Sequence, residues 1–403
     1  MPLDYQVFDP TPCRFPLPRV PVLPRGFQPA GAEDAALLAG ISPLPGDSLH
    51  YSRGRYALGA AYCCAGLGSG GALLAPAYHC VTMLDPALAL GAEVLLYPLS
   101  ADLAPDPAAL DALLEVSSKP VKALLATHFF GFVRDFSWLQ AWCAARGIVL
   151  IEDCSHTLCT ERYRVAGAGC YGRFVASSPY KFFASADGGW LYAPDADALA
   201  GVAVRPARWW DELRGLGHWL ERVRRRSISA ADSAALAAQL AALAGQAMET
   251  GNDKHLSRSG HSAHYQPERA SIAALRSSRW LAGHASLSAA INQRRANYRR
   301  WLRAVADLLH CRPLYPELPE AVVPYMFPLY IEHPLPHFYW LKQLGVPVWR
   351  WDEMAVSTCP VARDYRLHLL HLPCHQSLRE DEMDWLLAAL TQVLRASPVG
   401  AER

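Results

Sequence analysis

Asp153 and Lys181 are two residues whose types and spacing could do chemistry together. Asp153 lies just after the apolar run 148–151, and Lys181 closes a second short apolar stretch 28 positions later (181 − 153). Short apolar runs flanked by glycine and polar residues are typical of buried parallel strands, and open α/β sheets bind ligands at the carboxyl ends of such strands. A lysine can form a Schiff base with a carbonyl, and a carboxylate can keep a pyridine nitrogen protonated. The pair therefore predicts a pyridoxal phosphate site.

Lysine is scarce in this chain, which narrows the choice of nucleophile. Of five lysines, only Lys181 is embedded among aromatic and small residues. The others lie beside a predicted strand, in a polar run or in a predicted surface helix: Lys119, Lys122, Lys254 and Lys342. Either Lys181 or Asp153 alone would as readily be a surface cation or a strand-end acid, and it is their combination that predicts catalysis.

Composition sets the outer limits of the function. The 403 residues suffice for two domains, and a formal net charge of +1 gives no reason to expect a nucleic-acid partner. No run of 18 apolar residues occurs, although 52% of the residues are hydrophobic, so no membrane span is expected. The N-terminus lacks a signal-peptide pattern, and eleven cysteines without a CxxC pair favour reduced thiols. We therefore expect a cytoplasmic protein.

The chain divides into segments of different character. Residues 1–50 are rich in proline and predict an extended N-terminal arm. Strand and helix patterns alternate over 51–205, which predicts the large domain of an α/β fold: a mostly parallel sheet with helices on both faces. Residues 206–265 form a helical and polar insertion, 266–310 connecting helices, and 311–403 a smaller C-terminal α+β domain.

Individual elements follow from the same patterns. The predicted strands, in chain order, are 72–75, 93–97, 123–129, 148–151, 174–176, 327–331 and 346–351. Residues 251–266 are expected to be a polar loop, and a closing helix to run from about 379 to 395. Ser377 and Glu380 have the spacing of a capping box before that helix.

Several motifs, taken in order, resemble those of a known family. They are the Gly54 loop, 76–80, 127–131, 151–156, Lys181 and 187–189. The set resembles the fold-type I pyridoxal phosphate enzymes of the DegT/DnrJ/EryC1/StrS aminotransferase family. The resemblance is good over about residues 50–195 and looser from 270 to the end.

The resemblance implies roles for five residues around the cofactor ring. Lys181 would form the Schiff base, and Asp153 would pair with the pyridine nitrogen. His156 stands where the family places a Gln or His near the phenolic oxygen. His128 ends a strand beside that of Asp153 and is expected at the same edge, and Ser178 would offer a hydroxyl to the phosphate.

The resemblance also implies which backbone segments surround the cofactor. The N–H groups of Gly54, Arg55 and Tyr56 would bind the phosphate, as at other glycine-started helices. The turn 78–80 would cover the outer face of the ring. Cys80 stands where the family usually has the stacking aromatic residue, which leaves two neighbours in the turn as candidates: His79 and Tyr78.

Two further departures from the family concern the substrate. Ala176 replaces the usual phosphate-binding serine, so that Ser177 or Ser178 would have to substitute for it. The Asn-x-Arg stretch by which many members reach into a neighbouring subunit is not recognisable. We therefore expect a substrate other than a standard nucleotide sugar.

Charged residues outside these motifs allow alternative interpretations. Arg350 ends a predicted strand and could bind a substrate carboxylate bidentately, with Tyr78 nearby, or form a surface ion pair. Arg222 and the arginines 224–226 could bind a phosphorylated partner or form a solvated helix face. The histidines of the polar stretch 251–266 more often indicate solvent exposure than ligation, so no metal is predicted.

The resemblance predicts an aminotransferase and, as for the family, a homodimer. The amino donor would be glutamate or glutamine, and the acceptor a keto group of a sugar-like compound or a specialised metabolite. A pyridoxal phosphate lyase, decarboxylase or carbon–carbon bond-forming enzyme is the alternative, because the pocket decides the fate of the same carbanion. A non-catalytic regulatory protein of this fold is disfavoured by the presence of Lys181.

Overall fold

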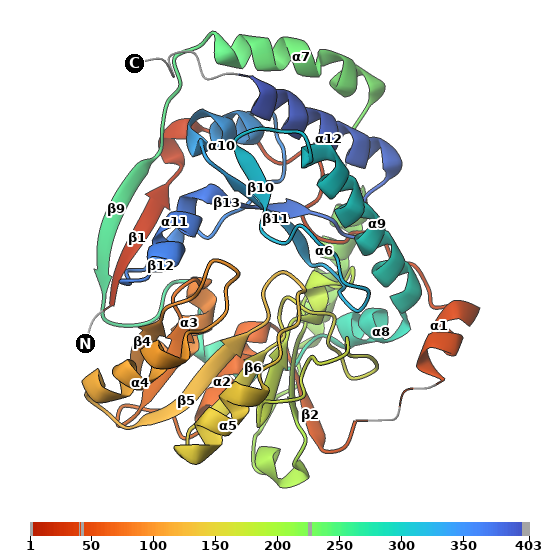
Figure 1. Ribbon diagram of the computed structural model, residues 1–403. Helices are drawn as coiled ribbons and strands as arrows, with labels where there is room; N and C mark the ends of the chain where they lie inside the picture. Colours follow the sequence, from red (N-terminus) through yellow and green to blue (C-terminus); the bar gives the residue numbers. More distant parts are fainter. Residues whose placement is uncertain (1–2, 40, 42–43, 225–227, 397–403) are drawn as a thin grey trace.

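A seven-stranded sheet is the centre of the molecule (Figure 1). The structure, a computed structural model, describes residues 3–39, 41, 44–224 and 228–396. The strand order is β2-β8-β7-β6-β5-β3-β4, and β3 to β7 run parallel while β8 is antiparallel to both its neighbours. The strands are β2 (Asp47–Tyr51), β3 (Ala72–Pro76), β4 (Glu93–Tyr97), β5 (Val121–Thr127), β6 (Val149–Asp153), β7 (Phe174–Ser177) and β8 (Gly189–Ala193). This is the predicted mostly parallel α/β sheet.

The inner strands are apolar throughout because both faces of the sheet are covered. Alternate residues belong to different cores: Leu125 and Ile151 face one, and Leu124 and Leu150 face the other. Helices α2 and α3 pack against the first face, and α5 packs against β6. The helices between the strands are α2 (Gly54–Cys64), α3 (Val81–Ala89), α4 (Pro107–Val116) and α5 (Ser137–Ala145).

A second, C-terminal layer lies above the central sheet in Figure 1. Its antiparallel sheet has the order β10-β11-β13, formed by β10 (Cys311–Pro313), β11 (Met326–Ile331) and β13 (Leu369–Pro373). The helices of this layer are α9 (Leu287–Val305), α10 (Pro334–Gln343), α11 (Pro360–His368) and α12 (Glu380–Arg395). Its α+β character and the long helix α9 agree with the sequence pattern.

The N-terminal arm is not merely an extended segment. Its strand β1 (Leu3–Asp9) pairs with β12 (Glu353–Ala355) on one side and with β9 (Asn252–Arg258) on the other. β9 lies in the stretch for which the sequence predicted a polar loop, and that prediction is wrong. The side chains of β9 are mostly exposed and polar. Its pairing with β1 therefore rests on backbone hydrogen bonds, which no apolar pattern in the sequence predicts.

The remaining helices come from the arm and from the segments between the two layers. They are α1 (Ala32–Leu38), α6 (Trp209–Arg224), α7 (Ala230–Ala244) and α8 (Arg276–His284), with short 3₁₀ turns η1 (Thr11–Cys13), η2 (Pro179–Lys181), η3 (Ala196–Leu199) and η4 (Pro267–Arg269). α7 packs on α10 and α12 at the top of Figure 1, and α6 packs on α8 below it. The predicted insertion therefore contributes to both layers.

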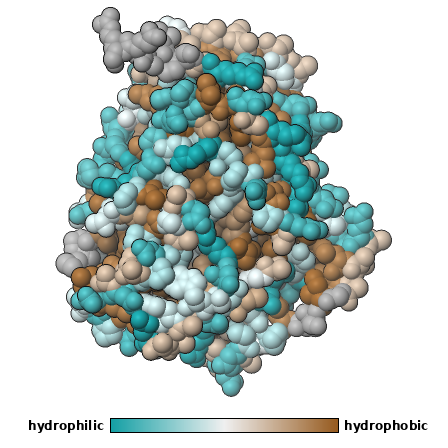
Figure 2. Space-filling model, in the orientation of Figure 1, coloured by the Kyte–Doolittle hydropathy of each residue, from teal (hydrophilic) through white to brown (hydrophobic). Residues whose placement is uncertain are grey.

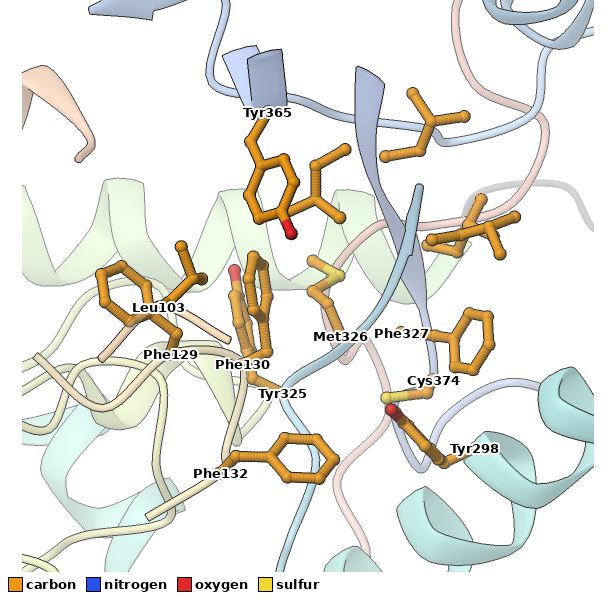
Figure 3. Close-up of a cluster of buried hydrophobic side chains, with 14 of the residues drawn as sticks. Leu103, Phe129, Phe130, Phe132, Tyr298, Tyr325, Met326, Phe327, Tyr365 and Cys374 are labelled. Carbon is orange, nitrogen blue, oxygen red and sulfur yellow. The ribbon is translucent and has the colours of Figure 1, made fainter. Parts of the chain in front are cut away.

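Aromatic side chains join the two layers, as Figure 3 shows. Phe130 and Phe132 follow β5, and the Phe132 ring lies 5.7 Å from that of Tyr298 and stacks at 4.0 Å on Tyr315. The backbone also crosses the junction, because the Tyr325 N–H donates to the Phe130 carbonyl (2.8 Å). Gly131 between the two phenylalanines has φ +98°, and a Cβ there would come within 2.3 Å of the Val323 carbonyl oxygen. The junction is therefore close-packed.

Two local predictions in the C-terminal layer are wrong. Residues 346–351 form no strand beyond an isolated bridge from Trp349 to His371. Pro347 within this run lacks the N–H that a ladder needs.

Ser377 does not cap α12, because its Oγ accepts from the N–H groups of Arg25 and Gly26 (3.3 Å each). Arg379 is the N-cap residue instead, and the Glu382 carboxylate accepts its N–H at 3.0 Å.

Among the described residues, no helix combines the length and apolarity that a bilayer crossing requires. Hydrophilic and hydrophobic residues are interspersed over the face shown in Figure 2.

Candidate active site

A cavity of about 450 Å³ lies between the carboxyl edge of the central sheet and the C-terminal layer. Asp153 at the end of β6 lines it, as does Lys181 in η2. His156 and Ser178 also line it, so the structure brings together residues that are up to 28 positions apart (181 − 153) in the sequence.

Asp153 is held at the sheet edge by the register of three strands. Its Cα pairs with Thr127 of β5 and with Ala176 of β7. Its Oδ1 accepts the Ser155 N–H at 2.9 Å, and the residue is 2% exposed. The neighbouring Thr127 Oγ1 also lines the cavity wall, is buried, and has no hydrogen-bond partner among the described residues. A buried hydroxyl without a partner is costly, which favours a polar occupant of the cavity.

Lys181 is fixed through its backbone, whereas its side chain lines the cavity. Its N–H donates to the Ser178 carbonyl (3.0 Å), and its carbonyl accepts from the Arg294 guanidinium (3.0 Å). The Nζ lies 5.3 Å from the centre of the Tyr325 ring. Hydrogen bonds therefore hold the backbone of Lys181 in place, whereas its side-chain amine is left to move within the cavity.

The part of the cavity at the N-terminus of α2 suits a phosphate. α2 begins there at Gly54, and no side chain of the described residues caps its N-terminus. The Ser178 hydroxyl donates to the Ser155 hydroxyl at 3.1 Å, and both residues line the cavity. A Cβ on Gly54 would come within 2.1 Å of the Ser178 Oγ, so only glycine fits. Ser177 is excluded, because its hydroxyl donates to the Cys159 carbonyl (2.7 Å).

These features fit pyridoxal phosphate. The α2 terminus and two hydroxyls match its phosphate, Asp153 its pyridine nitrogen, and Lys181 its carbonyl. The Tyr56 N–H is not part of the cradle, since it donates to the Arg53 carbonyl at 3.0 Å. The guanidinium of Arg55, predicted only as a backbone donor, is bonded to the His264 carbonyl at the rim.

Two histidines stand beside Lys181 in an aromatic wall. The His156 ring lies 4.5 Å from that of Tyr325, and the His371 ring lies 4.7 Å from that of Phe130. Burial and then the charge of Lys181 lower the pKa of His371 to about 3, and the same causes hold the pKa of His156 well below its ordinary value. Both imidazoles are therefore neutral near pH 7.

The neutral state of His371 predicts a pH dependence of stability. The unfolded chain binds a proton at this histidine below about pH 6.5, whereas the folded chain does not, so stability falls as the pH decreases from 6.5 towards 3. We expect His371→Gln to reduce this slope by up to about 1.4 kcal/mol per pH unit. Urea denaturation between pH 5 and 7 measures the slope, and His255→Gln in exposed β9 is the control. Equal slopes in both variants would contradict the assignment.

Two of the predicted residues in the turn 78–80 do not line the cavity. His79 is fully buried; its Nε2 accepts the Ala355 N–H (3.2 Å), which ties β12 to the central sheet. The Tyr78 hydroxyl bonds the His371 Nε2 (2.8 Å), so Tyr78 supports the wall from behind. Cys80 alone of the turn 78–80 lines the cavity. The turn therefore presents no aromatic ring to the cofactor.

His128 faces away from the cavity, although it follows β5 directly. Its Nε2 donates to the Glu152 carboxylate (2.8 Å), and its Nδ1 accepts the Arg134 N–H (3.1 Å). Glu152 also accepts from the N–H groups of Tyr171 (2.9 Å) and Gly172 (3.0 Å). These bonds anchor the loop after β6. They also occupy the oxygens of the Glu152 carboxylate, which are then not available to bind a metal ion. Alternation along the strand makes Thr127, not His128, the residue that lines the cavity.

Arg350 lines the cavity, but its guanidinium is engaged by neighbouring side chains. Its guanidinium lies 3.7 Å from the centre of the Phe338 ring, 4.6 Å from that of Phe8, and 3.5 Å from the Asp352 carboxylate. Burial lowers the pKa of Arg350. The side chain is engaged with the arm and with α10, so a substrate contact would require it to leave these partners.

Arg294 of α9 is the residue that positions Lys181, and the sequence analysis missed it. It is completely buried and donates to the carbonyls of Lys181 (3.0 Å), Tyr325 (3.1 Å) and Pro324 (3.2 Å), and to the Gln376 side chain (2.9 Å). Burial lowers the pKa of Arg294 to about 10, so it stays charged at pH 7. The Arg294 guanidinium therefore links the backbone of Lys181 to that of Tyr325 in the aromatic wall.

We expect Arg294→Met to destabilise the protein by at least about 3 kcal/mol, because several buried acceptors lose their donor at about 1–3 kcal/mol each. Arg294→Lys keeps the charge but lacks the planar fork, so it should recover only part of the loss. Urea denaturation measures both variants. Wild-type stability in Arg294→Met would refute this role.

Some missed residues had a signal in the sequence and others had none. Ser155 lies two positions after Asp153, and Thr127 ends the strand beside β6, so both could have been found from strand order. Tyr325, Trp351 and His371 come from the C-terminal layer, and no local pattern connects them to Lys181.

Comparison with known proteins agrees with this geometry. Residues 48–205 match the DegT/DnrJ/EryC1/StrS aminotransferase family. No curated protein matches the chain.

Solved structures show the same fold over nearly the whole chain. NtdA from Bacillus subtilis, with bound cofactor PMP, is 15% identical over 95% of this chain and 87% of its own, with a TM-score of 0.60. DesV from S. venezuelae is 18% identical, covering 94% and 100%, with a TM-score of 0.59. PseC from Helicobacter pylori is 12% identical, covering 93% and 99%, with a TM-score of 0.58. The family match over 48–205 and this shared fold confirm the resemblance to the DegT/DnrJ/EryC1/StrS aminotransferase family.

Proposed function

We propose that this aminotransferase moves an amino group from glutamate or glutamine to the keto group of a sugar-like compound or specialised metabolite. The observation that carries the proposal is that Lys181 and Asp153 line one cavity with the uncapped N-terminus of α2. The lysine forms a covalent adduct with the cofactor, and the carboxylate holds its ring nitrogen protonated.

Each residue has a defined task in such a transfer. Pyridoxal phosphate supplies the carbonyl that takes up the amine and a ring that accepts electrons. Ser155, Ser178 and the α2 terminus hold the phosphate, which fixes the ring relative to Lys181. The Lys181 Nζ, which lines the cavity, would bind the cofactor and would then carry the proton that the transfer moves. His156 and His371 are both neutral, so neither imidazole competes with Lys181 as a proton donor.

The walls of the cavity support an acceptor without a nucleoside diphosphate. Asp352 and Glu353 line its mouth, and Trp349 and Trp351 supply aromatic surface. Both carboxylates are already paired, Asp352 with Arg350 (3.5 Å) and Glu353 with Arg258 (2.9 Å). A volume of about 450 Å³ that also holds the cofactor leaves room for a small acceptor only. Similar folds include an aminotransferase involved in the biosynthesis of pseudoaminic acid and a 3-amino-5-hydroxybenzoic acid synthase.

A single-turnover experiment tests the transfer without knowledge of the acceptor. Protein loaded with pyridoxal phosphate and mixed with ¹⁵N-labelled glutamate should release one equivalent of 2-oxoglutarate and retain the label. Release of carbon dioxide, or of a fragment other than the keto acid, would instead indicate decarboxylase or lyase chemistry. The labelled protein is then offered a panel of keto-sugar nucleotides, and rapid loss of label to any of them would refute the acceptor proposal.

We also propose, from the family resemblance, that the active form is a homodimer. The exposed apolar side chains of α6, among them Trp209 (60%) and Trp210 (58%), offer a surface for association. β1 pairs within its own chain and so supplies no argument for an arm that crosses to a partner. Sedimentation at micromolar concentration tests this, and a fully active monomer would contradict it.

A further inference from the structure

A second cavity of about 330 Å³ lies on the other side of the loop that follows Lys181. Its lining includes Asp187 of that loop, Pro179 of η2, His50 of β2, Trp190 of β8 and Trp280 of α8. Neither Lys181 nor Asp153 lines it. It is therefore a separate space beside the catalytic loop.

Two residues that line this cavity each have a buried hydrogen-bonding group without a partner among the described residues. These groups are the Ser185 hydroxyl and the Trp190 indole Nε1–H, both from residues that are 1% exposed and line the cavity. The indole can only donate, and the hydroxyl can donate as well. Leaving such a group unsatisfied costs about 1–3 kcal/mol, so the cavity is suited to a ligand that accepts hydrogen bonds.

The charges at the cavity favour an anion. Arg162, Arg276 and Arg279 line it, and the latter two are exposed at its mouth. The two acids of the lining are already engaged: Glu161 pairs with His50 at 3.1 Å, and Asp187 accepts the Leu275 N–H at 3.3 Å. The lining therefore carries three guanidinium groups and two carboxylates, and Arg162 is itself bonded to the Gly283 carbonyl, which leaves the exposed Arg276 and Arg279 for an anion.

α6 holds the walls of this cavity in place. The Glu212 carboxylate accepts the Arg276 N–H (2.6 Å) and so caps α8, while Arg222 donates to the Ser185 carbonyl (2.7 Å). The two helices approach closely at Gly215, where a Cβ would come within 2.3 Å of the Leu275 side chain. α6 and α8 both lie beyond residue 205, where the family match ends. One wall of the cavity thus comes from the part of the chain outside that match, whereas His50, Ser185 and Trp190 lie within it.

We propose that this second cavity binds the oxyanion group, phosphate or carboxylate, of a small molecule. Arg276 and Arg279 attract and pair with it, and Ser185 and Trp190 donate hydrogen bonds to it. The proposal does not depend on the identity of the amino acceptor. Because the cavity shares the segment 185–189 with the catalytic loop, occupation would stabilise that loop.

The test uses the protein saturated with pyridoxal phosphate, so that the cradle at α2 is filled. Inorganic phosphate and glutarate are titrated separately by calorimetry. We expect saturable binding of at least one of them, and about tenfold weaker binding in Arg276→Gln and in Arg279→Gln, the loss of one charge-assisted hydrogen bond. Phosphate alone binding would assign a phosphate-bearing ligand, and glutarate alone a carboxylate-bearing one.

Controls separate this site from general charge effects. Arg299→Gln removes an exposed arginine of α9 and should bind as the wild type does. Ser185→Ala should weaken binding without changing the net charge. Absence of binding by both probes, or equal affinity in all four variants, would overturn the proposal. Loss of amino transfer with intact binding would refute the proposed function only.

Discussion

Replacement of Lys181 by alanine is expected to reduce turnover by roughly 10⁴-fold or more, because the change removes both the nucleophile and the proton carrier. The fold should be unaffected. The Lys181 side chain makes no hydrogen bond that the described part of the chain records, whereas its peptide keeps its bonds to Arg294 and Ser178. Turnover with glutamate and the urea midpoint together measure the effect.

The covalent assignment has its own test. Borohydride reduction of the loaded wild-type protein, followed by peptide mapping, should place the pyridoxyl group on Lys181. Lys122→Ala, at an exposed position of β5, is the matched control and should retain full activity. An adduct on any of the other four lysines would exclude Lys181 as the nucleophile.

The central sheet was predictable because its signals are local. Parallel strands covered on both faces must be apolar runs, and β3, β4 and β6 begin within one residue of their predicted positions. Asp153 and Lys181 were recognisable for the same reason, since Asp153 ends such a run and Lys181 follows another after a short turn. Open α/β sheets bind ligands at the edge where these runs end.

His128 shows why neighbouring positions are harder to assign. It lies only one residue beyond Thr127, but successive side chains point to opposite sides. The sequence does not reveal which of the two lines the cavity, because both are polar. The choice depends on Glu152, which reaches His128 through the pairing of β5 with β6.

The rest of the site depends on tertiary contacts that no sequence spacing encodes. Arg294, Tyr325 and His371 reach Lys181 from 113, 144 and 190 positions away (294 − 181, 325 − 181 and 371 − 181). In the sequence, Arg294 is one of several arginines of α9, and nothing local distinguishes it from the others. Its burial follows only from the packing of α9 against the junction of the two layers.

Asp153→Asn is the sharper test of the cofactor chemistry, because it changes charge and almost nothing else. The asparagine is isosteric, and its amide oxygen can still accept the Ser155 N–H that the Asp153 Oδ1 accepts at 2.9 Å. The strand register with Thr127 and Ala176 is a backbone property and should persist. Urea stability should therefore remain close to that of the wild type.

Turnover of Asp153→Asn should fall by about 100-fold or more, which corresponds to about 2.7 kcal/mol of transition-state stabilisation. The physical reason is that a neutral amide does not hold the pyridine nitrogen protonated, so that the ring accepts electrons poorly. Cofactor affinity, measured by fluorescence titration, should change much less, since the phosphate cradle at Gly54, Ser155 and Ser178 is intact. Asp106→Asn, at the exposed N-cap of α4, is the matched control, because asparagine caps helices as well as aspartate does. Turnover of Asp153→Asn within about tenfold of the wild type, a difference of about 1.4 kcal/mol, would show that this carboxylate does not pair with the cofactor nitrogen.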